Sequence, residues 1–383
     1  MYIYETPEFH GYIADIINYL ILVFLLFYFL YKKSITKFQF NCLLFSTAFC
    51  FLGNYLFFDF YSFPDQNKYF GGAERVRDEF HGYLFYNTPF LDKFQSVSQL
   101  IPSIIFAIIP MPFVETINSL SFFNKLIFIC FIIFFIKNKI ISDKNIVLFV
   151  FYPSILLYSS LSLKDNLVLI SIVLSIYFLI NNKIKLSSLF LLILLGTKPY
   201  VGFFTLYFFI LYLIFNKFDM YLKNNYFIKF ISILILQVFI MQFFFGDIII
   251  QKINHHIFSF WEQGKQEGNY IYYENLDNLY LDIPKNMLYG FFELNYDYLN
   301  TARIILLIEN SFTILIIIFL FKKYYKILGN KLIFWFIFFV ITNTIFSFIV
   351  TNPGTFGRYK YPILFAFVFA TLFELKKYYY EKK

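Results

Sequence analysis

The chain has 383 residues, of which 60% are hydrophobic and 15% are charged, and its mean hydropathy is +0.65. These values exclude a soluble globular protein, in which about a quarter of the residues are charged. The net charge of +8 does not indicate nucleic acid, because the lysines form short clusters beside apolar runs, where membrane proteins carry them. We therefore predict an all-α protein, a polytopic transmembrane helical bundle.

Other features of the composition have plain explanations. The 60 Phe and 33 Tyr residues, together with many Lys, Asn and Ile residues, indicate a coding bias toward AT-rich codons rather than an aromatic cage for sugars. Cys42, Cys50 and Cys130 lie inside apolar runs, which predicts packing residues rather than disulfides or a thiolate metal site. The first eleven residues contain no Lys or Arg, so we expect no cleavable signal peptide.

Eleven apolar runs are long enough, or nearly so, to cross the hydrocarbon core of a bilayer, which takes about 20 residues. They lie at 12–31, 38–58, 117–136, 146–162, 165–181, 184–197, 199–216, 226–250, 303–321, 332–350 and 361–375. The segment 100–116 is also apolar, but Pro102, Pro110 and Pro112 interrupt it. We predict a re-entrant or interfacial segment there rather than a twelfth span.

Lysine clusters occupy every second connection between these runs. They are Lys32-Lys33-Lys37, Lys137-Lys139-Lys144, Lys183-Lys185, Lys217-Lys223, Lys322-Lys323-Lys326-Lys331 and Lys376-Lys377-Lys382-Lys383. Because Lys and Arg are enriched in cytoplasmic loops, all six clusters fit one cytoplasmic side. Eleven spans then place the N-terminus outside and the C-terminus inside. Residues 1–383 are expected to form a single integral membrane domain with long extracytoplasmic loops at 59–99 and 251–302.

The predicted cytoplasmic connections are all short, and no Walker or dinucleotide-binding glycine motif follows a strand. ATP and nucleotide sugars therefore have no place to bind. If the protein is an enzyme, its substrates are expected to be membrane-embedded or extracytoplasmic, most simply lipid-linked molecules at the outer leaflet.

The first long loop is rich in charged side chains. Asp59 and Asp65 follow the end of a predicted helix, and Glu74 and Arg75 follow a pair of glycines. The segment 73–86 has the pattern of an amphipathic helix on the membrane surface. A carboxylate in this loop could act as general base toward a membrane-bound acceptor hydroxyl, and a neighbouring arginine would keep it ionised. The alternative is a solvated loop with ordinary charge pairs.

Cations also occur in three short connections on the same predicted side, against the positive-inside bias. Lys164 precedes an aspartate, Lys198 lies in the tight turn GTKPY, and Arg358 and Lys360 lie in TNPGTFGRYKYP. Arg offers a fixed fork of donors and Lys a mobile point charge, so we expect a shared pocket for phosphate or pyrophosphate. The sequence NPGT predicts a rigid turn with backbone N–H groups toward the anion. The alternative is snorkelling of the cations to lipid headgroups.

Ionisable residues inside the predicted spans are candidates of a second kind. Glu309, beside Asn310, lies roughly two turns inside its span, where a charge costs several kcal/mol unless it is paired or hydrated. Glu309 could pair with one of the turn cations Lys164, Lys198 or Arg358. Lys125 and Lys229 lie nearer the ends of their helices and are predicted to snorkel.

The second long loop carries Trp261, many Tyr residues and seven carboxylates from Glu262 to Asp297, and IPKNMLYGFF in it predicts an interfacial helix. Aromatic rings and carboxylates suit sugar rings, although Tyr is frequent throughout the chain. His255 and His256 have no further ligands at metal spacing, so we predict no metal site.

The order of PSILLYSSLSLKDN, GTKPY, IENS and NPGTFGRYKYP resembles multi-pass polymerases of bacterial O-antigen and capsule gene clusters, over roughly residues 60–370. The resemblance implies a multi-pass protein of the bacterial cytoplasmic membrane that joins polyprenyl-linked oligosaccharides at the outer leaflet without a metal cofactor. Its partners would be the polyprenyl-linked glycan, membrane lipids and other polysaccharide-assembly proteins. Arg358 would be the leading phosphate ligand, with Lys164 and Lys198 as helpers.

Three alternatives stay open. The acidic first loop is similar to that of GT-C glycosyltransferases, which would make Asp59 or Asp65 the catalytic carboxylate and would allow a divalent cation. A flippase of lipid-linked oligosaccharide would typically show repeated halves and Gly- or Pro-interrupted helices. Only Pro153 interrupts a predicted span in its middle, and charges on one face favour an enzyme. A non-catalytic assembly partner has no positive feature in the sequence.

Overall fold

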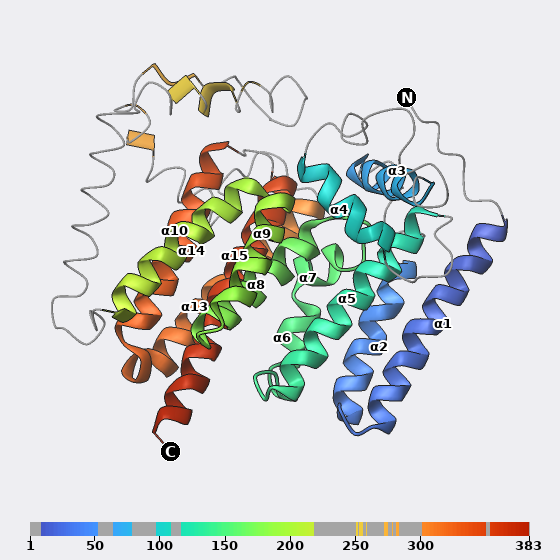
Figure 1. Ribbon diagram of the computed structural model, residues 1–383, viewed down its shortest axis with the longest axis horizontal. Coiled ribbons are helices and arrows are strands. Elements are labelled where there is room, and N and C mark those ends of the chain that lie inside the picture. Colours follow the sequence, from blue (N-terminus) through green and yellow to red (C-terminus); the bar gives the residue numbers. More distant parts are fainter. Residues whose placement is uncertain are drawn as a thin grey trace. The chain divides into compact units, whose positions relative to one another are not determined.

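The computed structural model describes residues 9–52, 64–78, 97–108, 116–217, 301–349 and 353–382, with single residues and short pieces between 250 and 282 (Figure 1). Regular secondary structure in these ranges is helical throughout, which confirms the predicted all-α class. The described helices are α1 (Phe9–Tyr31), α2 (Lys37–Leu52), α3 (Pro64–Asp78), α4 (Val97–Ile108), α5 (Ile117–Lys137), α6 (Ile146–Phe151), α7 (Pro153–Tyr158), α8 (Asp165–Ile180), α9 (Ile184–Thr197), α10 (Pro199–Lys217), α13 (Thr301–Leu328), α14 (Asn330–Ile349) and α15 (Pro353–Glu381).

Three of the described helices are long and apolar enough to cross a membrane, namely α5, α10 and the Ile13–Tyr31 part of α1. Shorter apolar helices are α4, α8, α9 and most of α14. Large apolar side chains on these helices point outward, such as Phe24 (69% exposed) and Phe203 (62%). An outward apolar surface is expected where a helix faces lipid rather than water. Residues 226–249 of the predicted span 226–250 lie outside the described residues.

The helix boundaries differ from the prediction in two places, at α3 and at the break between α6 and α7. The amphipathic helix predicted at 73–86 begins earlier, because α3 runs from Pro64 through the glycine pair to Asp78. The span predicted at 146–162 is broken into α6 and α7, since Tyr152 takes the extended conformation (φ −60°, ψ 127°) that is typical before a proline. Helix α4 is only 12 residues, or about 18 Å, long, which is too short to cross a bilayer.

The chain divides into two compact units. Unit 1 comprises Met1–Ser175 and Ile184–Gly202, and unit 2 comprises Ile176–Lys183 and Phe203–Lys383. In unit 1, helices α1, α2 and α5 pack on one another, as Figure 1 shows, with an aromatic cluster of Tyr19, Phe51 and Phe122 between them. Helix α3 packs on α4 and α5, and α4 packs on α9.

Two lysine-rich connections lie together at one end of unit 1. The Thr36 hydroxyl, between α1 and α2, donates to Asp143 Oδ1, between α5 and α6, over 2.9 Å. The Lys137 ammonium lies 5.3 Å from the centroid of the Phe29 ring. Helix α5 has 21 residues, so its first residue, Ile117, lies about 30 Å from this end.

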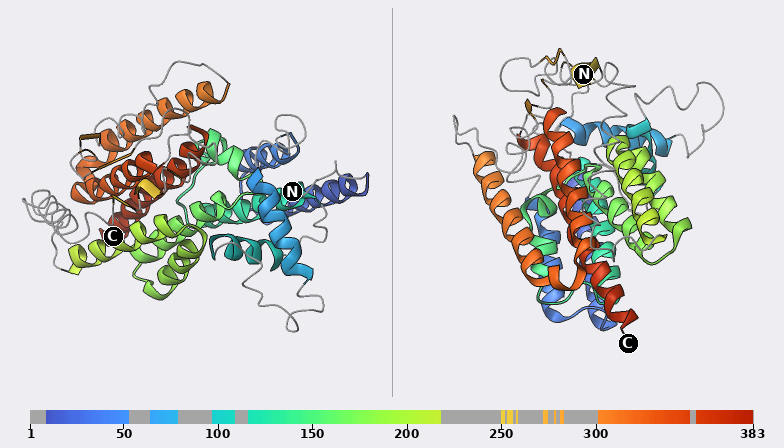
Figure 2. Two further views of the ribbon diagram at one scale, coloured as in Figure 1. Left: turned by 90° about the horizontal axis from the view of Figure 1, so that it is seen from above. Right: turned by 90° about the vertical axis from the view of Figure 1, so that its left-hand side faces the viewer.

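In unit 2, helices α13, α14 and α15 lie side by side (Figure 2) around a core that includes Trp335 and Phe338. The buried Glu374 of α15 connects three helices, because it accepts from the Tyr212 hydroxyl over 2.7 Å and from the Lys331 ammonium over 3.0 Å. The Lys377 ammonium donates to the Ile180 carbonyl at the end of α8. The lysine-rich ends of these helices therefore gather at one end of unit 2.

Candidate functional site

The first of the predicted cations, Lys164, lies at the end of the non-helical segment 159–164. This segment leaves helical conformation between α7 and α8 and is buried almost throughout, so its backbone groups need partners inside the protein. Asn124 of α5 supplies two, since its amide donates to the carbonyls of Leu161 and Leu163, each over 2.7 Å. The Ser162 N–H donates to Gln66 Oε1 of α3 over 3.0 Å, and the Ser162 hydroxyl donates to the Ile117 carbonyl. The run SSLSLK thus ends beside the start of α5, far from the lysine-rich end of unit 1.

Lys164 binds a backbone carbonyl that a proline in α4 leaves without its helical donor. Pro102 lies inside α4 and has no N–H, so the carbonyl four residues earlier, on Ser98, lacks its usual helical donor. The Lys164 ammonium donates to that carbonyl over 3.1 Å and lies 5.8 Å from the centroid of the Tyr69 ring of α3. Lys164 therefore bridges α3 and α4 rather than extending into solvent.

Lys198 is the single residue between α9 and α10, as the sequence predicted for a tight turn. Its ammonium lies 3.5 Å from Asp165 Oδ1, and both side chains are buried. Asp165 stands in the first turn of α8, where the helix dipole favours a carboxylate. Lys164 and Asp165 are consecutive in the chain, so two of the predicted cations and one carboxylate form a single group in unit 1, which we call the Lys164–Lys198 cluster.

Two glycines allow the close helix packing that this cluster needs. A Cβ atom at Gly202 would lie 2.8 Å from the Cα atom of Leu195, so α9 and α10 approach each other there at backbone distance. A Cβ atom at Gly196 would lie 2.6 Å from Ile101 Cδ1, which is the end of a flexible side chain on α4.

Gly202→Ala is therefore expected to destabilise the protein by about 1–3 kcal/mol, because backbone must move to accommodate the methyl group. Gly196→Ala should cost less, since the Ile101 side chain can rotate away. The midpoint of thermal unfolding in detergent measures both effects. Equal midpoints for the two variants would contradict the backbone-distance packing at Gly202.

Helix α3 carries the charged residues of the first long loop. Gln66, Tyr69, Ala73 and Val76 form its buried face, and Val76 packs against Leu100 of α4. The described charged side chains of α3 lie outside this buried face. Asp65, Glu74 and Arg75 are half-buried there, and partial burial lowers the pKa of the neighbouring Arg77. Asp59 lies outside the described residues. Through Gln66 and Tyr69, α3 contacts Ser162 and Lys164, which puts the loop acids on the helix that borders the Lys164–Lys198 cluster.

The other predicted residues lie in unit 2. The expected turn at NPGT is wrong: α15 begins at Pro353, in keeping with the preference of proline for a first helical position, so Arg358 and Lys360 lie in the first turns of a helix. Lys360 is buried and its ammonium donates to Asn310 Oδ1 of α13. Glu309, next to Asn310, is also buried, and Arg358 is half-buried. Lys360 therefore contacts Asn310, the neighbour of Glu309 in the chain, whereas the sequence predicted Lys164, Lys198 or Arg358 as the partner of Glu309.

Unit 1 contains two buried ionic residues that were not predicted correctly from the sequence. One was predicted to snorkel, and the other was not identified as a candidate. The snorkelling predicted for Lys125 is wrong: its side chain is 0% exposed, and its ammonium donates to Ser46 Oγ (2.9 Å) and Ser159 Oγ (2.6 Å). Asp15 of α1 is equally buried and accepts from the Thr116 hydroxyl over 2.8 Å at the N-cap of α5. An aspartate inside the apolar run 12–31 was the signal that could have found it.

No three His, Cys, Asp or Glu side chains gather closely enough to hold a metal ion in the described part of the chain. Comparisons of the chain with known protein families, curated proteins and solved structures find no match. Fold and site together therefore define a class: a helical protein with helices of membrane-spanning length and buried clusters of opposite charges.

Proposed function

We propose that the protein is a membrane glycosyltransferase that polymerises or extends a glycan carried on polyprenyl phosphate or pyrophosphate. It would act at the outer leaflet of a bacterial cytoplasmic membrane, with eleven spans, the N-terminus outside and the C-terminus inside. Two gathered lysine-rich connections in unit 1, and the gathered lysine-rich ends in unit 2, support this orientation.

The observation that carries the proposal is the Lys164–Lys198 cluster. Two cations from separate short connections lie with one carboxylate beside α3, at the end of unit 1 away from its lysine-rich connections. Cations that only anchor a helix have no need to converge or to be buried. A site that binds a phosphate group needs both properties, because desolvated cations hold an anion more strongly.

The reaction follows from these roles. A carboxylate of α3, with Asp65 as the leading candidate, accepts the proton of the acceptor hydroxyl. The acceptor oxygen then forms a bond to the anomeric carbon of the donor sugar, while the bond from that carbon to the phosphate oxygen breaks. Lys164 and Lys198 stabilise the departing phosphate charge. Unit 2 contains a second set of candidates for the same two roles. Arg358 and Lys360 are the cations of this set, and Glu309 is its carboxylate.

Elongation of an extracted lipid-linked oligosaccharide by the purified protein tests the proposal. Lys164→Ala is expected to abolish the glycan ladder while leaving protein abundance unchanged, because Lys164 is half-buried and its ammonium donates to the neutral Ser98 carbonyl. Lys144→Ala is the matched control, since Lys144 is exposed in the connection between α5 and α6. A normal ladder with Lys164→Ala, or an absence of elongation by the unmodified protein, would refute the assignment.

A second candidate function is transport of the lipid-linked oligosaccharide across the membrane. This alternative is favoured by the break between α6 and α7 and by the buried Lys125, which donates to Ser159 at the end of α7, because transporters build their sites from interrupted helices and buried ionic groups. Reconstituted vesicles with a labelled lipid-linked sugar distinguish the two. Transbilayer movement without bond formation supports the transporter, whereas chain growth without movement supports the transferase.

A further inference from the structure

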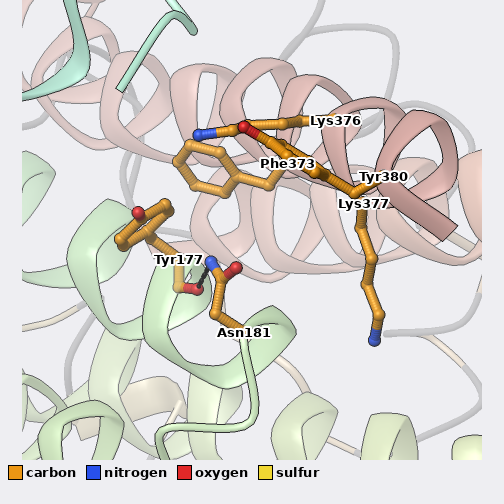
Figure 3. A pocket seen from close by; sticks show the side chains of 6 residues that line it. All are labelled: Tyr177, Asn181, Phe373, Lys376, Lys377 and Tyr380. Atoms are coloured by element: carbon orange, nitrogen blue, oxygen red, sulfur yellow. Dashed lines mark hydrogen bonds between the residues drawn. The ribbon is translucent and has the colours of Figure 1, made fainter. Parts of the chain in front are cut away.

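A cavity of about 310 Å³ lies between α8 and α15 in unit 2, outside the residues that the proposed reaction uses. Its lining residues are Tyr177, Asn181, Phe373, Lys376, Lys377 and Tyr380. Figure 3 shows Tyr177 and Asn181 on the α8 side, facing the four residues that α15 supplies. All of these residues lie near the C-terminal ends of their helices, at the lysine-rich end of unit 2.

The lining combines an apolar wall with a cationic rim. Phe373 is buried, and its ring meets the Tyr177 ring edge-on with a centroid distance of 5.0 Å. The two lysines are half-buried, and the Lys376 ammonium lies 5.7 Å from the centroid of the Tyr380 ring. The six residues include two cations and no carboxylate, so the cavity favours an anion.

Hydrogen bonds hold the Asn181 and Lys377 side chains in place at the rim of the cavity. The Asn181 amide donates to the Tyr177 carbonyl over 2.7 Å, and the Lys377 ammonium donates to the Ile180 carbonyl over 3.2 Å. Both bonds satisfy carbonyls of the last turn of α8, which fixes the two side chains at the mouth of the cavity. Glu374, the nearest carboxylate of α15 along the chain, is bonded to Tyr212 and Lys331.

We propose that this cavity binds the phosphate headgroup of an anionic phospholipid from the leaflet on the lysine-rich side. A ligand with a phosphate and an acyl chain matches the two lysines at the rim and the apolar ring at the wall. Tyrosine rings and lysines at the ends of membrane helices lie at the depth of the headgroups, so the lipid reaches the cavity without leaving the bilayer. A free phosphate would use the cations alone and leave the apolar wall unused.

Lipid binding to the purified full-length chain tests the proposal, with phosphatidylglycerol as the probe and phosphatidylcholine as the neutral comparison. The double variant K376Q/K377Q is expected to weaken phosphatidylglycerol binding about 30-fold, because each lysine near the membrane surface contributes roughly fivefold. The matched control is K322Q/K323Q, which removes two exposed lysines from the lysine-rich end of α13 and leaves the cavity unchanged.

A second variant tests the cavity without changing the charge. Tyr380→Ala removes an exposed ring from the rim and should weaken phosphatidylglycerol binding about fivefold. An equal loss for both lysine pairs would show diffuse attraction and overturn the proposal, as would equal binding of phosphatidylcholine. Competition by glycerol phosphate as effective as that by phosphatidylglycerol would indicate a free-anion site and would also overturn it.

Discussion

Lys198→Met is expected to remove most of the folded protein from the membrane fraction as well as its activity. Asp165 and Lys198 are both buried, and the substitution leaves the Asp165 carboxylate without the ammonium 3.5 Å away. Breaking a buried ion pair by removing one partner costs about 3–5 kcal/mol, because the remaining charge stays desolvated. Protein abundance in membranes and the midpoint of thermal unfolding in detergent measure this loss.

The double variant Asp165→Asn with Lys198→Met separates structure from function. It removes both charges together, so no buried charge is left without its partner, and abundance should return close to that of the unmodified protein. Glycan elongation should stay absent, because the proposed phosphate ligand is still missing. Restored elongation in the double variant would show that Lys198 has a structural role only and would remove it from the proposed site.

The sequence predicted the cations of this cluster but not their partners. Lys164 and Lys198 stood out because they occupy short connections that the positive-inside bias leaves uncharged. Their bonds depend on tertiary packing. The Ser98 carbonyl is available to Lys164 because Pro102 lacks an N–H, and Asp165 at the start of α8 meets Lys198 at the α9–α10 junction. Local patterns carry the helix boundaries and the charges, whereas a contact between distant segments depends on how the helices pack.

The errors have physical reasons of the same kind. The glycine pair before Ala73 predicted a helix start, yet α3 continues through it, because packing of its buried face on α4 outweighs a cost of about 1 kcal/mol per glycine. Lys125 lies eight residues from the start of α5, or about 12 Å, which is within the usual range of snorkelling. The hydroxyls of Ser46 and Ser159 bind its ammonium inside unit 1 instead.

Asn124→Leu is expected to have the second largest effect, because it removes the donor that keeps the segment 159–164 in place. The Leu161 carbonyl would keep a bond from the Leu163 N–H at 2.8 Å, but the Leu163 carbonyl would be left buried without the amide that binds it at 2.7 Å. Asn166 would also lose Asn124 Oδ1 as an acceptor. Losses of this kind cost about 1–3 kcal/mol per group, so we expect the free energy of unfolding to fall by roughly 2–4 kcal/mol.

Asn138→Leu on the same helix is the matched control. Its amide donates to the Phe134 carbonyl at a half-buried position at the end of α5, where water can replace the lost bond. The free energy of unfolding should change little in this variant, and elongation should persist. Asn124→Leu should also loosen Lys164, so its ammonium should react faster with an amine-modifying reagent. Equal stability of the two variants, with unchanged Lys164 reactivity, would show that Asn124 does not position the Lys164–Lys198 cluster.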